Sequence, residues 1–254
     1  MTLALATCLA AQCKNADFPE AGGPTAIPAR PVETYAADPI QVGVLQIESG
    51  WSHTWAGGSQ LDTQSPMLRF GPWCNVEVRI TSPVTLGGFG DALIGGQYRF
   101  VRESKRVPAL AAGFTVKEPT AGDALGSGRR DESVTLMANK TIHGFALAAN
   151  TSFFAIGRLD GGHDGKGEWS VAVSHTLRGQ LGAIAEVYFD SRLNQSSPSY
   201  TNSTWALTYN VGRRIVIDSG AYVALSPGAA SPGRSIFAGV TYSLANVYQH
   251  TQGR

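Results

Sequence analysis

The sequence has few charged residues for its length. Only 15% of the 254 residues are Asp, Glu, Lys or Arg, whereas 43% are hydrophobic. Soluble domains usually carry roughly 25% charged residues, so this chain has too few charged residues to cover a surface that is fully exposed to water. The chain also lacks any run of about 18 consecutive apolar residues, which a membrane-spanning helix requires. These two absences leave either a soluble all-β protein or a membrane β-barrel, in which lipid-facing residues alternate with lumen-facing ones.

A dominant charge, a metal-binding spacing and a nucleotide-binding motif are also absent. The formal net charge is +1, which gives no electrostatic reason to expect nucleic acid as a partner. Cys8, Cys13 and Cys74 do not have the spacing of a zinc site, and an odd number of cysteines does not define a disulfide framework. The glycines in 87–90 and 161–162 fit turns rather than a P-loop or a Rossmann fingerprint. We therefore expect no cofactor and no metal.

The histidines do not predict an active site. Ser174 and His175 are adjacent, but neighbouring residues of a strand point to opposite faces, and nucleophilic catalysis needs the two groups within hydrogen-bond reach. The segment Asp160–Gly165 contains His163 and two aspartates that could hold calcium, although Gly-rich loops have this composition anyway. We expect no enzymatic activity. The five histidines are His53, His143, His163, His175 and His250.

The two ends of the chain lack the strand pattern of the middle. Residues 1–13 resemble the apolar part of a secretory signal without its basic leading region; a lipoprotein cleavage box at Leu5–Cys8 and a disordered tail are the alternatives. Residues 14–40 are rich in Pro, Ala and Gly and predict coil, which is either a periplasmic linker or a plug inside a barrel. Residues 41–246 are expected to form the barrel, followed by a C-terminal tail at 247–254.

From Gln41 onward, apolar and polar residues alternate with a period of two. In Trp169–Leu177 one face carries Trp, Val, Val, His and Leu, and the other carries Ser, Ala, Ser and Thr. The same alternation recurs in Asn75–Ile80, Leu181–Asp190 and Ser235–Leu244. It predicts strands with two different faces, which suits a membrane barrel and also a soluble antiparallel sheet with one wet face.

The connections between the predicted strands favour the barrel. Long Gly-, Ser- or Asp-rich connections, such as 55–63 and 158–166, take turns with short ones, such as 178–179 and 212. An antiparallel meander with short turns at one end and long loops at the other is typical of outer-membrane barrels, which have an even number of strands. Soluble sandwiches have Greek-key crossovers instead. The twelve predicted strands are Val42–Thr54, Gln64–Phe70, Asn75–Thr81, Phe89–Arg102, Pro108–Glu118, Arg130–Asn139, His143–Gly157, Gly167–Leu177, Gln180–Asp190, Tyr200–Val211, Arg213–Ser226 and Gly233–Ala245.

Several short motifs resemble those of a known family. They include Gln46–Gly50, Leu68–Gly71, Gly95–Phe100, Trp205–Asn210 and Gly239–Tyr242. Together they are similar to the outer-membrane transporter family named after the meta-pathway of phenol degradation, over roughly residues 30–244. The resemblance implies an outer-membrane β-barrel associated with the uptake of small, often aromatic, compounds.

The alternation places a set of polar and charged side chains inside the predicted barrel. Lipid-facing Arg or Lys near the midplane would cost about 2–4 kcal/mol each, so these residues are expected to face inward. They either line an aqueous path and set its selectivity or pair with one another and hold the barrel's shape. Arg69, Glu77, Arg79 and Arg99 are expected to form a coupled network. The full set is Glu48, Arg69, Glu77, Arg79, Gln97, Arg99, Lys117, Glu186, Arg214 and Asp218.

The sequence therefore predicts an all-β protein, a closed antiparallel up-and-down transmembrane barrel of about twelve strands in the bacterial outer membrane. Its partners would be membrane lipid and a small, aromatic or hydrophobic solute, which the barrel would pass as a channel or transporter. One alternative is a closed structural or loop-presenting barrel without transport. Another is a soluble all-β binding protein. Neither the solute nor the oligomeric state follows from the sequence.

Overall fold

The structure is a computed structural model that describes residues 13–56, 58–122, 125–193, 199–226 and 233–248. In that part of the chain the one helical element is a 3-10 turn, η1 (Asn15–Asp17). None of the described helical residues forms a helix long and apolar enough to cross a membrane. The strands are β1 (Val44–Ala56), β2 (Ser59–Gln64), β3 (Met67–Trp73), β4 (Val76–Thr81), β5 (Val84–Thr85), β6 (Gly88–Phe89), β7 (Ala92–Val101), β8 (Ala109–Glu118), β9 (Asp131–Ile142), β10 (Phe145–Gly157), β11 (His163–Arg178), β12 (Leu181–Asp190), β13 (Tyr200–Val211), β14 (Ile215–Ala224) and β15 (Arg234–Asn246).

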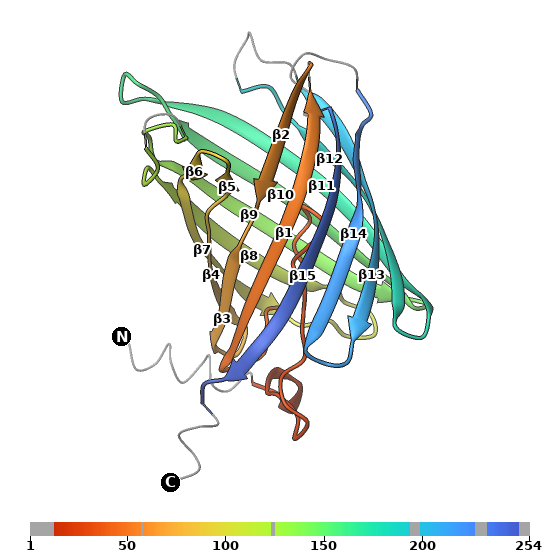
Figure 1. The fold of residues 1–254 in the computed structure, drawn as a ribbon. Coiled ribbons are helices and arrows are strands. Elements are labelled where there is room, and N and C mark those ends of the chain that lie inside the picture. The colour runs from red at the N-terminus through yellow and green to blue at the C-terminus, as the bar shows by residue number, and fades with distance from the viewer. Residues whose placement is uncertain (1–12, 57, 123–124, 194–198, 227–232, 249–254) are drawn as a thin grey trace, which may run out of the picture.

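The strands form one closed antiparallel barrel (Figure 1). Its wall has twelve positions, here called staves, each filled by one strand or by two short strands end to end. Strands β7 to β15 follow one another around the wall, each paired with its neighbours in sequence. On the other side, β4 pairs with β3, and β2 and β3 together make the single stave beside β1. Strand β15 pairs with β1 from Val44↔Asn246 to Trp55↔Arg234 and so closes the sheet. Closure pairs the backbone groups of every stave, which a sheet in hydrocarbon requires.

The expected fold class is confirmed, and most strand positions agree to within a few residues. The predicted long connections 55–63 and 158–166 are wrong in length. Strand β1 runs on to Ala56 and turns at Gly58 (φ +83°) into β2. Strand β11 starts early, at His163, where Arg158 pairs with the side chains of Asp160 and Asp164 at 2.6 and 3.3 Å. The side chains of Arg158, Asp160 and Asp164 close the second turn, and composition alone does not reveal such bonds.

The two faces of each strand differ as the period-two pattern requires. In β1, Gln46 and Glu48 are fully buried inside the barrel, whereas Ile47 and Trp51 keep 42% and 41% of their surface exposed on the outside. Large apolar residues are exposed outward on every long stave, with Val171 of β11 at 58%. The exterior is therefore a continuous apolar surface suited to lipid chains, and the polar residues are enclosed.

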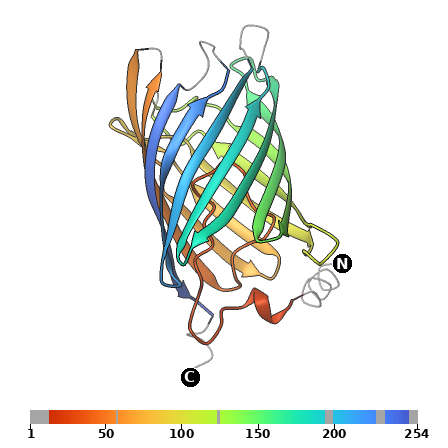
Figure 2. The ribbon, with the colours of Figure 1, turned by 90° about the vertical axis from the view of Figure 1, so that its right-hand side faces the viewer.

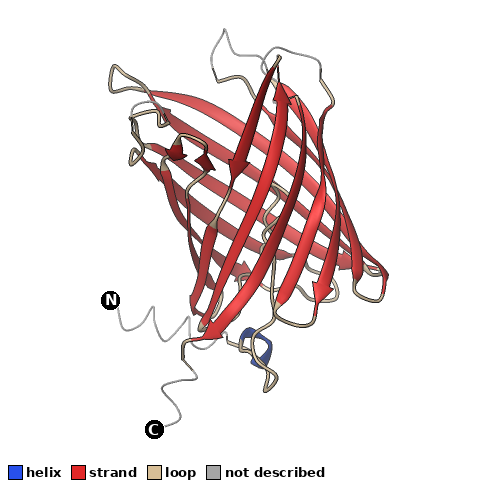
Figure 3. Ribbon diagram, viewed as in Figure 1, coloured by secondary structure: helices blue, strands red, loops and turns tan. Residues whose placement is uncertain are grey.

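The short turns gather at one end of the barrel. The β11–β12 and β13–β14 turns contain Gly179 and Gly212, both with positive φ (57° and 70°), a conformation that glycine adopts without steric cost. Asn246, the last residue of β15, lies at this end beside Gly43, because the Val247 N–H donates to the Gly43 carbonyl at 2.8 Å. The chain thus enters and leaves the barrel at the end with the short turns (Figures 1 and 3).

Candidate functional site: the barrel lumen

The lumen is occupied by the stretch that precedes β1. Residues 24–42, here called the inner segment, rise into the barrel from the end with the short turns, cross it, and return to β1 (Figure 2). The two ends of the segment lie side by side, because the Thr25 N–H donates to the Gln41 side chain at 3.1 Å. The segment has no regular secondary structure. Its backbone polar groups therefore need partners from the wall.

The ascending arm of the segment runs along β1. The Ile27 N–H donates to the Gln46 side-chain oxygen at 3.0 Å, and the Gln46 amide donates back to the Ile27 carbonyl at 2.9 Å. One step further along the strand, the Glu48 carboxylate accepts the N–H groups of Ala29 and Arg30 at 3.1 Å. Successive inward side chains of β1, Gln46 and Glu48, thus bind successive parts of the segment, first Ile27 and then Ala29 and Arg30.

The tip of the segment is held by Glu186 of β12. Its carboxylate accepts the N–H and the hydroxyl of Thr34, both at 2.7 Å, and the N–H of Glu33 at 3.2 Å. Thr204 of β13 donates a further hydrogen bond to it at 2.8 Å. Glu186 is buried and saturated with donors, so its role in this structure is to clamp the tip of the segment.

The descending arm crosses to the opposite wall. The Ala37 N–H donates to Asn139 of β9 at 2.8 Å, and Gln97 of β7 donates to the Ala36 carbonyl at 3.1 Å. The Ile40 N–H then reaches the carboxylate of Glu77 on β4 at 3.1 Å. The inner segment is therefore tied to strands on both sides of the barrel.

A chain of ion pairs runs across the wall behind the two arms. Arg69 of β3 lies between two carboxylates, 2.7 Å from Glu48 and 2.7 Å from Glu77. Arg79 continues the chain, with its Nε 3.7 Å from Glu77 and its Nη2 donating to Gln97 at 2.6 Å. All five side chains are buried, and buried charges are tolerated only when they are paired in this way.

Arg99 belongs to a second group, at the base of the segment. Its guanidinium donates to Asn75 at 2.7 Å and pairs with Asp38 and, at 2.9 Å, with Asp17. Arg102 also pairs with Asp17. The expected network of Arg69, Glu77, Arg79 and Arg99 is thus divided here into two clusters, because the base of the segment supplies its own carboxylates to Arg99.

Asp17 is held as a carboxylate. Burial alone would raise its pKa, but hydrogen bonds from Arg102, from the Lys14 backbone N–H and from Arg99 outweigh burial and leave the pKa below its ordinary value of 3.8. A disulfide between Cys13 and Cys74 joins the same base to the β3–β4 turn. This pairing could not be predicted from the sequence, because it depends on the path of the segment.

Arg30 lies in a slot made by two glycines. Gly50 of β1 and Gly239 of β15 are paired in register, and a Cβ atom on Gly50 would lie only 1.9 Å from the Arg30 guanidinium carbon. The Arg30 guanidinium donates to Asp218 of β14 at 3.3 Å. Sequence reasoning found Asp218 but neither Arg30 nor the two glycines, since nothing local marks a glycine pair that faces a third segment.

Lys117 lies away from the inner segment, whereas the guanidinium of Arg214 lies beside Gly23, just before that segment begins. Lys117, near the end of β8, pairs with Asp131 and lies 3.8 Å from Asp91 at the end of the barrel with the long loops. Arg214 is not on a strand: it is exposed in the β13–β14 turn, where its carbonyl accepts the Ser243 N–H at 2.9 Å. Strand β14 begins at Ile215, two residues later than the predicted start at Arg213.

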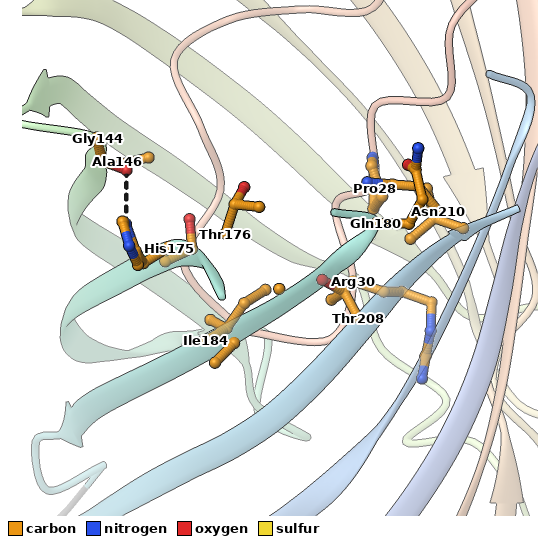
Figure 4. Close-up of a pocket in the computed structure, with 14 residues that line it drawn as sticks. Pro28, Arg30, Gly144, Ala146, His175, Thr176, Gln180, Ile184, Thr208 and Asn210 are labelled. Atoms are coloured by element: carbon orange, nitrogen blue, oxygen red, sulfur yellow. Dashed lines mark hydrogen bonds between the residues drawn. The ribbon is translucent and has the colours of Figure 1, made fainter. Parts of the chain in front are cut away.

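A cavity of about 320 Å³ remains beside the ascending arm. Pro28 and Arg30 line it together with inward residues near the short turns, among them Thr208 and Asn210 (Figure 4). His175 lies at its rim, with Nδ1 3.0 Å from the Gly144 carbonyl oxygen and its ring stacked on another aromatic side chain. The lumen at this end is therefore only partly filled.

The outer side of the tip is also open to water. Glu33 and Ala36 are exposed, although the barrel wall surrounds the segment. Tyr222 of β14 holds the tip from one side, by donating its hydroxyl hydrogen to the Pro31 carbonyl at 2.9 Å. Water-accessible space therefore lies on both sides of the tip.

No protein-family model matches the chain, and no curated protein matches it in sequence. Solved structures match its fold. The COG4313 outer membrane channel from Pseudomonas putida F1 is 12% identical, with a TM-score of 0.65 over 84% of this chain and 100% of that one. The NanC porin is 13% identical, with a TM-score of 0.59 over 79% and 100%. The KdgM porin, solved in complex with disordered oligogalacturonate, is 10% identical, with a TM-score of 0.55 over 78% and 99%. At these identities the similarity is one of fold.

Proposed function

We propose that this chain is a bacterial outer-membrane channel for small aromatic or hydrophobic molecules, in which the inner segment is the constriction. The observation that carries the proposal is the water-accessible space on both sides of the tip of that segment. A barrel built only as a scaffold needs neither space. The fold shared with outer-membrane channels and porins supports the same conclusion.

The class of solute is inferred from the rings that face the outer part of the lumen. Tyr222 and Phe237 pack together with their ring centres 4.8 Å apart, and Tyr188 lies on the same inner surface, hydrogen-bonded to Asn202. Tyr188 and Phe237 are mostly buried, at 9% and 3% exposed, so the partly exposed ring of Tyr222 is the one that offers an apolar contact to a solute. The resemblance of the sequence to the phenol meta-pathway family points to the same class.

One observation favours a second candidate, a sealed barrel that does not transport. The inner segment is bonded to side chains of both walls, and the buried carboxylates of Glu48, Glu77 and Glu186 are all used in holding it. Hydrogen bonds to charged groups contribute about 1.5–3 kcal/mol each. A segment held this firmly could be a permanent part of the barrel.

Excision of the inner segment separates the two candidates. Thr25 and Gln41 are neighbours in space, so residues 26–40 can be replaced by a short Gly-Ser linker without stretching the chain. We expect the wild type to give small single-channel currents and the excised variant to give currents several-fold larger. Heat-modifiable migration in detergent checks that both proteins are folded barrels, and a soluble protein would not show it.

The outcomes differ clearly. A wild type without current and without liposome swelling, together with an excised variant that conducts, would overturn the channel proposal in favour of the sealed barrel. Equal currents in the two proteins would show that the segment is not the constriction.

A further inference from the structure

The outer part of the lumen carries carboxylates that do not hold the inner segment. Glu168 of β11 and Asp190 of β12 are paired in register and face inward, above the tip of the inner segment. Glu33 belongs to the tip, where burial in the lumen disfavours its charged form most, followed by repulsion from the carboxylates of Glu186, Glu168 and Asp190. In the described part of the chain, neither the Glu33 nor the Glu168 carboxylate has a hydrogen bond or an ion pair of its own. A cluster of this kind attracts a cation.

The chain's own ammonium group shows which kind of cation this surface accommodates. The Nζ atom of Lys166 pairs with Asp190. The same atom lies 5.3 Å from the ring centre of Phe154 and 6.0 Å from that of Tyr200. An ammonium group over aromatic rings and next to a carboxylate is the arrangement by which proteins recognise organic cations. Lys166 forms its ion pair with Asp190 and attracts Glu168 only from a greater distance.

Buried polar atoms without partners lie beside these groups. Ser170 and Asn202 flank Tyr188 in register, one residue row below Glu168 and Asp190. Ser170 is 2% and Asn202 1% exposed, and each has a side-chain oxygen without a hydrogen-bond partner among the described residues. Buried oxygens of this kind normally find a donor. An N–H donor entering from the lumen could supply one.

The acidic groups are not arranged for a metal ion. Among the described residues, no three His, Cys, Asp or Glu side chains converge closely enough to hold one. Divalent cations require several oxygen ligands at about 2–2.6 Å, whereas an ammonium group is satisfied by one carboxylate and by ring faces. The surface therefore suits a cation that is large, organic and partly apolar.

From these contacts we infer that the outer lumen, formed by Glu33, Glu168, Asp190, Tyr188 and Tyr200, binds solutes that combine an ammonium group with an aromatic or aliphatic body. The inference rests on the proposed function and narrows its solute class to amines. Glu33 and Glu168 supply the countercharge, and the rings contact the apolar part. Because Glu33 belongs to the tip, such a solute would bind directly at the constriction.

Binding and permeation are tested separately. Isothermal titration of the detergent-solubilised wild type uses three probes of similar size: phenethylammonium, phenylacetate and 2-phenylethanol. We expect saturable binding of phenethylammonium alone. In the double variant Glu33→Gln and Glu168→Gln its affinity should fall about tenfold. Glu132→Gln is the matched control, since Glu132 lies near the same rim on β9, is paired with Arg130 at 3.3 Å and faces outward, and it should bind like the wild type.

Zero-current potentials in a potassium chloride gradient give the second measurement. We expect the wild type to prefer potassium over chloride, and the double variant to lose most of that preference. Preferential binding of phenylacetate, or unchanged phenethylammonium affinity in the double variant, would overturn the inference. A protein that binds phenethylammonium but passes no current would instead contradict the channel function and leave the amine site intact, so the two failures are distinguishable.

Discussion

At the scale of single residues, the burial of charged side chains in the lumen is explained by their ion-pair partners. Arg69 lies between Glu48 and Glu77, and each of these carboxylates also accepts backbone N–H groups of the inner segment. The guanidinium lets two carboxylates approach each other behind the segment. An arginine suits this position because its planar fork binds one carboxylate on each side.

Replacing Arg69 with methionine should destabilise the barrel by about 3–5 kcal/mol, the cost of leaving buried charges without a partner. The measurement is the urea dependence of folding into lipid vesicles, followed by tryptophan fluorescence. Arg106→Met is the matched control, because Arg106 is exposed in the β7–β8 turn, and it should behave as wild type. An equally small effect of both substitutions would mean that water enters the cluster and screens it.

At the scale of elements, the inner segment is a loop fastened at both ends. Its far end continues into β1, and its near end is fixed by the Cys13–Cys74 disulfide and by Asp17, which pairs with Arg99 and Arg102. Between these anchors the segment is held mainly by hydrogen bonds from its backbone, together with the ion pairs of Arg30 with Asp218 and of Asp38 with Arg99. Movement of the tip therefore does not require the whole segment to leave the barrel.

The near anchor should depend on pH. The pKa of Asp17 is below 3.8 in the folded protein, so its ion pairs stabilise the anchor fully above the unfolded pKa and are lost as the pH falls through the lower, folded pKa. We expect protease cleavage near Asp17 to be slow at pH 6 and to accelerate below about pH 4 with an acid-stable protease. Asp17→Asn should be cleaved at a similar rate at both pH values, and an acceleration as large as that of the wild type would exclude Asp17 as the titrating group.

At the scale of the whole molecule, the apolar exterior and the polar lumen are two consequences of one closed sheet. Val171 of β11 is 58% exposed in the middle of its strand and faces away from the lumen. The residue beside it, Ser170, is 2% exposed and faces inward. This difference between neighbours is what a wall between lipid and a protein interior requires.

Val171→Arg should weaken insertion into lipid vesicles by about 2–4 kcal/mol, the cost of an arginine at the bilayer midplane. The comparison is Val107→Arg, at an exposed position in the β7–β8 turn, which should cost little. The readout is the urea midpoint of folding into vesicles. Similar midpoints for the two variants would show that Val171 is not in contact with hydrocarbon.

The sequence by itself determined the staves and their two faces. A side chain's face is fixed by its odd or even position along a strand, so Trp169–Leu177 could be assigned without knowing its neighbours. The polar residues that this parity placed inside, such as Glu48 and Glu186, are buried there. Arg214 is exposed because it lies in a turn, where the parity of a strand does not apply.

Only the tertiary structure decided what those inward residues do. The Pro-rich stretch 14–40 has no periodicity, so neither its position in the lumen nor its partners could be read from it. The Cys13–Cys74 disulfide, the slot for Arg30 at Gly50 and Gly239, and the clamp at Glu186 all join residues far apart in the chain. Local patterns report which face a residue occupies. They do not report what stands opposite it, because that depends on how the barrel closes around the segment.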